Sequence, residues 1–169
     1  MKQPKRTYIG AYASLRFRGE DLDPSDVTRA LRLPPDDMHR RGDLRLSRTS
    51  KGKVSQAAPY RLGIWIMSSK EWVTSPRIQV HLQWILDQLK GKHPALAALL
   101  ARGYIGDVPC FSSGRTKAAP SIPKGIRDQF RELQLDVWID HVDLGRNEAT
   151  NYDATDRKNI APGREEPSN

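Results

Sequence analysis

The first clear pattern in the chain is an alternation of apolar and polar side chains over residues 7–18. Its apolar positions are Ile9, Ala11, Ala13, Leu15 and Phe17. Successive side chains of a strand point to opposite faces of its sheet, so this alternation predicts a strand with one buried face. Alternation recurs over residues 60–68 and 135–142, which we predict as two further strands. The 60–68 strand has large apolar residues on both faces, so we expect both faces to be covered.

Apolar residues spaced three or four apart predict helices between these strands. The spacing is clearest at Ile78, Leu82, Ile85 and Leu89. The Ser75-Pro76 pair before this stretch and Gly91 after it are typical helix boundaries. Asp23 followed by Pro24 predicts a second, capped helix, which should end before two prolines at 34–35. Residues 122–133 predict a third main helix, and residues 94–101 a shorter helical piece.

Three segments give weaker signals. Residues 104–111 predict a strand, and Pro109 within it favours the edge of a sheet or a bulge. Residues 43–48 alternate weakly and could form an edge strand. Residues 47–59 are rich in Ser, Lys, Gly and Ala, so we expect a mobile basic insert there.

Together these elements predict a single domain of the α+β class. We expect a mainly antiparallel sheet of four to five strands with three main helices. Because helices at this spacing each cross back over a sheet, the nearest common plan is ferredoxin-like, of the split βαβ type. The domain should cover residues 7–144, after a basic N-terminal arm at 1–6 and before a disordered polar tail at 145–169.

Charge is unevenly distributed along the 169 residues, whose formal net charge is +8. Residues 1–60 carry thirteen Lys and Arg against seven Asp and Glu, and within residues 39–53 six basic residues face one Asp. Such a patch could attract phosphate or an acidic protein surface; the alternative is a solvated loop.

Two other features bear on the compartment. No apolar run approaches the roughly 18 residues that a membrane span needs, and we expect neither a signal peptide nor membrane association. The single cysteine, Cys110, excludes an internal disulfide and a cysteine-based zinc cluster. We therefore expect a cytoplasmic protein.

The order of these elements resembles a known family. The segments that carry the resemblance are GEDLDPSDVT (19–28), LRLPPD (31–36), RGD (41–43), IWIMS (64–68), HLQWIL (81–86) and LQLDVWID (133–140). In this order and spacing they are similar to a bacterial family catalogued as domain of unknown function 4279. The resemblance covers roughly residues 8–142. It implies a fold and a bacterial source, and it carries no catalytic residues to transfer.

Residues with catalytic potential are scattered. Asp140, His141 and Asp143 could seed a metal site or an acid/base pair, because carboxylates and imidazole suit both roles; charged residues where an edge strand meets a polar tail are the alternative. We expect His81 to be a neutral, hydrogen-bonded helix histidine, and Cys110 to be a small buried apolar residue. We therefore predict no enzyme, no cofactor and no bound metal, with the 140–143 cluster as the competing enzymatic hypothesis.

Binding is the function that the sequence favours. Trp65 and Trp138 lie on strand faces opposite their aliphatic neighbours, where exposed aromatics would anchor an interface. Coverage of those faces by helices or by a homodimer is the alternative. The candidate binding residues are Arg40, Arg41, Arg45, Arg48, Lys51, Lys53, Trp65 and Trp138. We predict a non-enzymatic protein-binding module of a regulatory or immunity type; the alternative is a nucleic-acid-binding protein that uses the basic loop 39–53.

Overall fold

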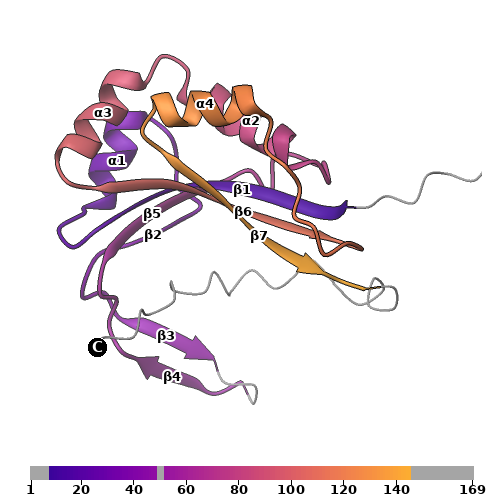
Figure 1. The fold of residues 1–169 in the computed structure, drawn as a ribbon. Coiled ribbons are helices and arrows are strands. Elements are labelled where there is room, and N and C mark those ends of the chain that lie inside the picture. The colour runs from indigo at the N-terminus through magenta and orange to yellow at the C-terminus, as the bar shows by residue number, and fades with distance from the viewer. Residues whose placement is uncertain (1–7, 49–51, 146–169) are drawn as a thin grey trace, which may run out of the picture.

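A mixed five-stranded sheet with helices on one face forms the body of the molecule, as the computed structural model shows (Figure 1). The structure describes residues 8–48 and 52–145. Its strands are β1 (Tyr8–Gly19), β2 (Asp37–His39), β3 (Arg45–Arg48), β4 (Val54–Ala57), β5 (Gly63–Ser68), β6 (Ile105–Gly114) and β7 (Asp136–Asp143). Its helices are α1 (Pro24–Leu31), α2 (Ile78–Leu89), α3 (His93–Ala101) and α4 (Lys124–Glu132).

The sheet has the strand order β2-β5-β1-β6-β7. The central strand β1 is antiparallel to both β5 and β6, and β2 is antiparallel to β5. At the other edge β7 runs parallel to β6, because α4 carries the chain back over the sheet between them. The α+β class is confirmed. The prediction was a mainly antiparallel sheet, and the observed sheet is mixed because β7 pairs with β6 in parallel. A split βαβ unit would place another strand between β6 and β7, which are adjacent here.

The start of α1 follows the local sequence. Asp23 is the N-cap, and its side chain accepts a hydrogen bond from the Ser25 amide at 2.9 Å. Pro24 occupies the first helical position, where its missing N–H leaves no bond unmade. The helix ends at Arg32, which adopts a left-handed φ of 53°. The prediction of a capped helix here is confirmed.

The start of α2 differs from the prediction. The helix begins at Ile78, and its N-cap Arg77 makes no side-chain capping bond. The Ser75 hydroxyl instead accepts a hydrogen bond from the Arg77 amide at 3.2 Å, so the Ser75-Pro76 pair forms a turn ahead of the helix. The prediction that Ser75 marks the helix boundary is therefore wrong, because its hydroxyl bonds to the amide of Arg77, before the first helical residue.

Pro109 was predicted to mark a sheet edge or a bulge, yet β6 lies between β1 and β7. The β1–β6 register pairs Ala13 with Cys110 and Arg16 with Asp107, and the two positions between these pairs are not bridged. Since proline has no N–H to donate, the strand keeps its central place at the cost of a gap in one ladder.

The segment 37–59 is more regular than the sequence indicates. Residues 37–39 form the edge strand β2, which no pattern predicted. Strands β3 and β4 pair into an antiparallel hairpin, so part of the insert expected to be mobile at 47–59 is a strand. This hairpin is a separate two-stranded sheet, and it projects away from the sheet on the side opposite the helices (Figure 1).

The hydrophobic core lies between the sheet and its helices. Leu15 and Phe17 of β1 point into it, as do Trp65 of β5 and Phe130 of α4. The Trp65 indole donates to the Thr28 hydroxyl at 3.0 Å, which satisfies its polar atom inside the core. The helices α1 to α4 all cover the same face of the sheet (Figure 1), and within the described residues no helix lies against the opposite face.

Candidate interaction surface

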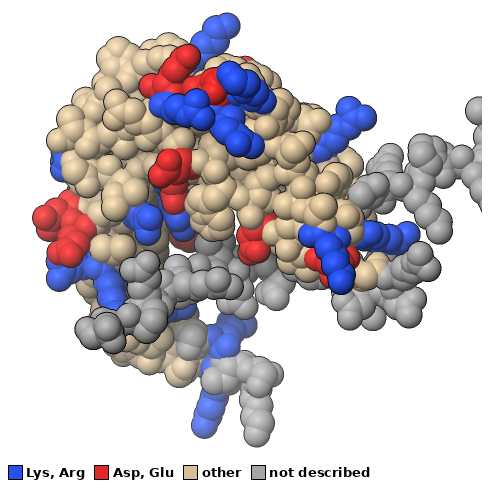
Figure 2. All heavy atoms as spheres, viewed as in Figure 1, with Lys and Arg blue, Asp and Glu red and all other residues tan. Residues whose placement is uncertain are grey.

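The β3–β4 hairpin exposes large apolar side chains beside basic ones. Leu44, Leu46 and Val54 are 65%, 70% and 57% exposed. In the register Arg48 faces Val54, and Arg45 faces Ala57. Residues 44–70 contain six Lys and Arg and no Asp or Glu. Figure 2 shows basic side chains on the lower part of the molecule, where the hairpin lies.

Stacked rings fix the base of the hairpin. The His39 ring lies 3.5 Å from the Tyr60 ring, centroid to centroid, at an interplanar angle of 18°. The Arg45 guanidinium lies 5.9 Å from the centroid of the Tyr60 ring. Burial lowers the pKa of His39 below its ordinary value of 6.5. A neutral imidazole stacked on a phenol therefore connects β2 to the start of β5.

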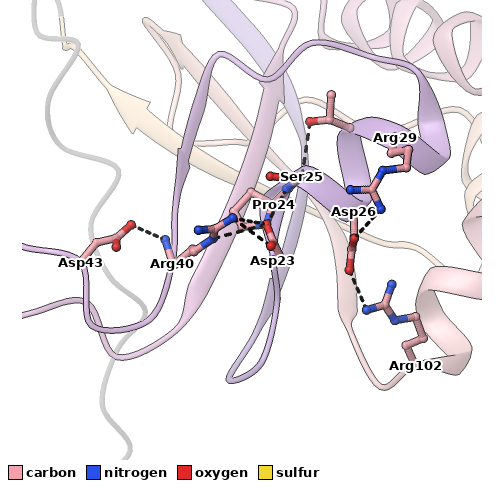
Figure 3. Close-up of polar contacts among 9 residues, drawn as sticks. Asp23, Pro24, Ser25, Asp26, Arg29, Arg40, Asp43 and Arg102 are labelled. Carbon is pink, nitrogen blue, oxygen red and sulfur yellow. Dashed lines mark hydrogen bonds and ion pairs between the residues drawn. The ribbon is translucent and has the colours of Figure 1, made fainter.

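The Arg40 side chain and backbone are already paired with other residues of the protein (Figure 3). Its Nη2 donates to both carboxylate oxygens of Asp23, at 3.0 and 2.9 Å, and its backbone N–H donates to Asp43 at 2.7 Å. The Ser25 amide and the Arg40 guanidinium together keep the pKa of Asp23 below its usual value. Arg40 thus ties the end of β2 to the cap of α1, and a partner would have to replace Asp23 to use it.

Arg41 lies at a hollow of about 590 Å³ beside the hairpin base. Its Nη1 donates to Glu20 Oε2 at 2.9 Å. The two side chains are 55% and 71% exposed, so solvent screens this ion pair. The hollow is lined by Glu20, Arg41, Gly42, Tyr60, Arg61 and Leu62.

The face of the sheet opposite the helices, which we call the open face, carries an ion pair at its centre. Arg16 Nε and Nη2 donate to the two carboxylate oxygens of Asp107, at 2.9 and 2.6 Å. The Trp138 ring lies beside this pair, 5.9 Å from the guanidinium carbon, and is 46% exposed. Tyr12 stacks on Phe111 from the neighbouring strand at 5.2 Å. The open face is therefore amphipathic, with its central charges paired.

The predicted tryptophans have different surroundings. Trp138 lies on the open face as expected. Trp65 is fully buried, because the alternation of β5 turns it toward α1, and a buried ring offers no surface to a partner. Trp65 therefore does not belong to the candidate surface. Trp72 is exposed and stacks on Trp84 of α2 at 6.5 Å, on a loop that the sequence patterns did not single out.

The cluster at the end of β7 does not assemble a metal site. Nowhere in residues 8–48 and 52–145 does a group of three or more His, Cys, Asp or Glu side chains lie close enough to hold an ion. His141 Nε2 lies 2.7 Å from the Thr116 carbonyl oxygen; a carbonyl only accepts, so this nitrogen carries the hydrogen. His141 Nδ1 and Ser112 Oγ, on adjacent strands, are buried without a hydrogen-bond partner. Ser112 has no exposed surface, so no dissolved substrate reaches its hydroxyl in this conformation.

The other two candidate nucleophiles or bases are buried, as predicted. His81 is fully buried between the Ser69 hydroxyl and the Ser75 carbonyl oxygen, each 2.8 Å from a ring nitrogen. Burial lowers its pKa, which keeps the ring neutral. Burial also raises the pKa of the Cys110 thiol to about 12, so this sulfur stays protonated at neutral pH.

The structure therefore brings together part of the predicted binding set. Arg45, Arg48 and Lys53 lie on the hairpin, Arg40 and Arg41 lie at its base, and Trp138 lies on the open face. Lys51 lies outside the described residues. The patterns missed Glu20 and Tyr60, which contact the basic residues through the fold. Tyr60 lies within the segment 44–70, which contains no acidic residue, and the sequence gives no stronger signal for it.

The chain is similar to a known protein family. No helix within the described part of the chain is long and apolar enough to cross a membrane. No curated protein and no solved structure matches the chain. A family model described as a domain of unknown function, DUF4279, matches residues 7–144. The match spans most of the chain and the whole described sheet, and the chain therefore belongs to the DUF4279 family.

Proposed function

We propose that this chain is a protein-binding module that docks on an acidic partner through the β3–β4 hairpin. The observation that carries the proposal is the exposure of Leu46 and Val54 on the hairpin and of Leu44 directly before it. Within the described residues, no third strand pairs with β3 or β4. An isolated hairpin is only marginally stable in water, and exposed aliphatic side chains are removed from water when a partner covers them.

The mixture of side chains favours a protein over a nucleic acid. Arg45, Arg48 and Lys53 supply positive charge, which steers an acidic surface toward the hairpin and sets its orientation. The aliphatic residues beside them supply apolar area, which phosphates do not need. Nucleic-acid surfaces of this kind combine cations with exposed aromatic rings. On the hairpin the exposed large side chains are aliphatic.

A pull-down from a bacterial lysate tests the proposal, with the full chain as bait, with and without nuclease, at two salt concentrations. The proposal predicts a protein that is captured in the presence of nuclease and lost when the bait carries Leu46→Ser with Val54→Ser. These substitutions remove apolar surface from an exposed site, so the fold should persist.

The matched control is the double substitution Ile105→Ser with Val80→Ser, which also removes two exposed aliphatic side chains but outside the hairpin. Capture that the control bait keeps and the hairpin variant loses places the contact on the hairpin. Equal capture by wild type and both variants would refute the proposal.

The runner-up is nucleic-acid binding through the same basic hairpin, which the six cations without an acid in residues 44–70 favour. Arg45→Glu with Arg48→Glu is the better test than charge reversal at Arg40 and Arg41, because those two already pair with Asp23 and Glu20. Binding of a labelled duplex that weakens steeply with salt, and is lost in the Arg45/Arg48 variant, would favour this reading over the first.

We place this activity in a bacterial cytoplasm, in a regulatory or immunity-type role. The single cysteine suits a reducing compartment. The positive net charge argues against neutralising a basic nuclease toxin, which would require an acidic surface.

A further inference from the structure

The hollow at the base of the hairpin already holds a carboxylate. Glu20 follows β1 and extends from one wall to Arg41, which follows β2. The Glu20 Oε2 to Arg41 Nη1 distance of 2.9 Å is that of a charge-assisted hydrogen bond. The hollow can therefore bind a carboxylate through a guanidinium.

This internal contact is exchangeable. Both side chains are more than half exposed, so solvent screens the ion pair and it adds little to stability. A carboxylate from outside would meet the same guanidinium and could replace Glu20 at small cost. The rest of the lining would not repel it, because Glu20 is the only acidic residue among the six that line the hollow.

The walls also suit the carbon chain that bears such a carboxylate. Tyr60 offers a ring that the His39 stack holds in place, and Leu62 offers an aliphatic side chain.

We infer that this hollow is the pocket for a carboxylate side chain of the partner protein, bound by Arg41, and that Glu20 is a competitor built into the chain. The inference rests on the proposed function for the source of the carboxylate. A glutamate fits better than a phosphate, because Arg41 already binds a glutamate here and the apolar walls would contact its methylene groups.

The test uses N-acetylglutamate N-methylamide as the probe and the backbone amide of Gly42, in the lining, as the reporter by NMR of the full chain. The neutral N-acetylglutamine N-methylamide is the matched probe, and inorganic phosphate is the third. We expect a saturable shift of the Gly42 amide with the glutamate probe alone. Glu20→Gln should tighten this binding about two- to fivefold, the range of an exposed ion pair. Arg41→Gln should abolish it.

Two control variants make the same charge changes as Glu20→Gln and Arg41→Gln at positions outside the hollow. Glu132→Gln and Arg77→Gln alter exposed residues on α4 and next to α2, away from the hollow, and should leave the affinity unchanged. Equal shifts with the glutamate and glutamine probes, or tightening by Glu132→Gln equal to that by Glu20→Gln, would overturn the inference. Tighter binding of inorganic phosphate than of the glutamate probe would also overturn it, in favour of a phosphate site.

The probe experiment can refute the pocket without refuting the proposed function, and the capture experiment can do the opposite. The probe binds or does not bind without any partner, whereas the hairpin variants at Leu46 and Val54 change the capture of a protein without touching the lining. If the probe binds but protein capture does not depend on the hairpin, docking through the hairpin is refuted and the carboxylate pocket stands. If capture depends on the hairpin but the probe does not bind, the pocket is refuted and docking through the hairpin stands.

Discussion

At the scale of single residues, burial decides the charge state of the interior. The imidazole of His81 bridges two loops, since Ser75 precedes α2 and Ser69 follows β5. Nε2 faces a carbonyl oxygen and carries the hydrogen, so Nδ1 accepts from the Ser69 hydroxyl. The ring has no acidic partner among its hydrogen-bonding contacts, and its pKa is lowered by burial.

The stability of the protein should therefore fall in mildly acidic solution. In the unfolded chain the His81 ring binds a proton near its ordinary pKa of 6.5, whereas the folded ring binds it only at lower pH. The contribution of His81 is complete above pH 6.5 and is lost as the pH falls through the folded pKa. Urea unfolding at pH 7.5 and pH 5.5 should show a larger loss in wild type than in His81→Gln. An equal loss in both proteins would contradict this assignment.

For single residues, the sequence could predict burial only where a local pattern indicated it. The burial of His81 and Cys110 followed from their positions on apolar faces. The burial of Trp65 did not, because alternation tells which residues share a face but not which face the helices cover. The pairing of Arg40 with Asp23 depends on two segments that meet only in the fold.

At the scale of elements, the close approach of strands to loops makes glycine necessary at particular points. A Cβ on Gly63, the first residue of β5, would collide with the backbone carbonyl oxygen of Leu22. Backbone atoms cannot turn aside as the end of a flexible side chain can. By contrast, a Cβ on Gly125 in α4 would meet no atom within 4 Å.

We expect the two glycine-to-alanine substitutions to act in opposite directions. Gly63→Ala should lower the free energy of unfolding by about 1–3 kcal/mol, the usual cost of overpacking. Gly125→Ala should raise it by about 0.4–1 kcal/mol, because alanine restricts the unfolded chain and fits the helix. Urea unfolding of the three proteins measures both effects. A Gly63→Ala variant as stable as wild type would show that Leu22 can move aside.

Elements with local signals were predictable, and those that depend on distant partners were not. The cap at Asp23 and the alternation of β1 act within a few residues. Strand β2 has three residues, and only its pairing with β5 makes it a strand. The central place of β6 despite Pro109, and the parallel direction of β7, follow from the path of the chain over the sheet. No local pattern encodes that path.

At the scale of the whole molecule, the five-stranded sheet and the β3–β4 hairpin differ in the contacts that stabilise them. The five-stranded sheet has helices on one face and paired charges at the centre of the other. The β3–β4 hairpin is a separate pair of strands that hydrogen-bond to each other, and stacked rings lie at its base. Local stability follows the amount of buried contact, so the hairpin should open far more often than the sheet.

Amide hydrogen exchange measures this difference directly. The amides of β1 and β6 should exchange only through global unfolding, whereas those of β3 and β4 should exchange orders of magnitude faster through local opening. If the hairpin is the docking element, a bound partner should slow exchange in β3 and β4 and leave β1 unchanged, because docking adds the cover that the free hairpin lacks. Protection in the free hairpin equal to that of β1 would mean that other contacts already stabilise it. The exposed aliphatic residues would then no longer indicate a missing partner.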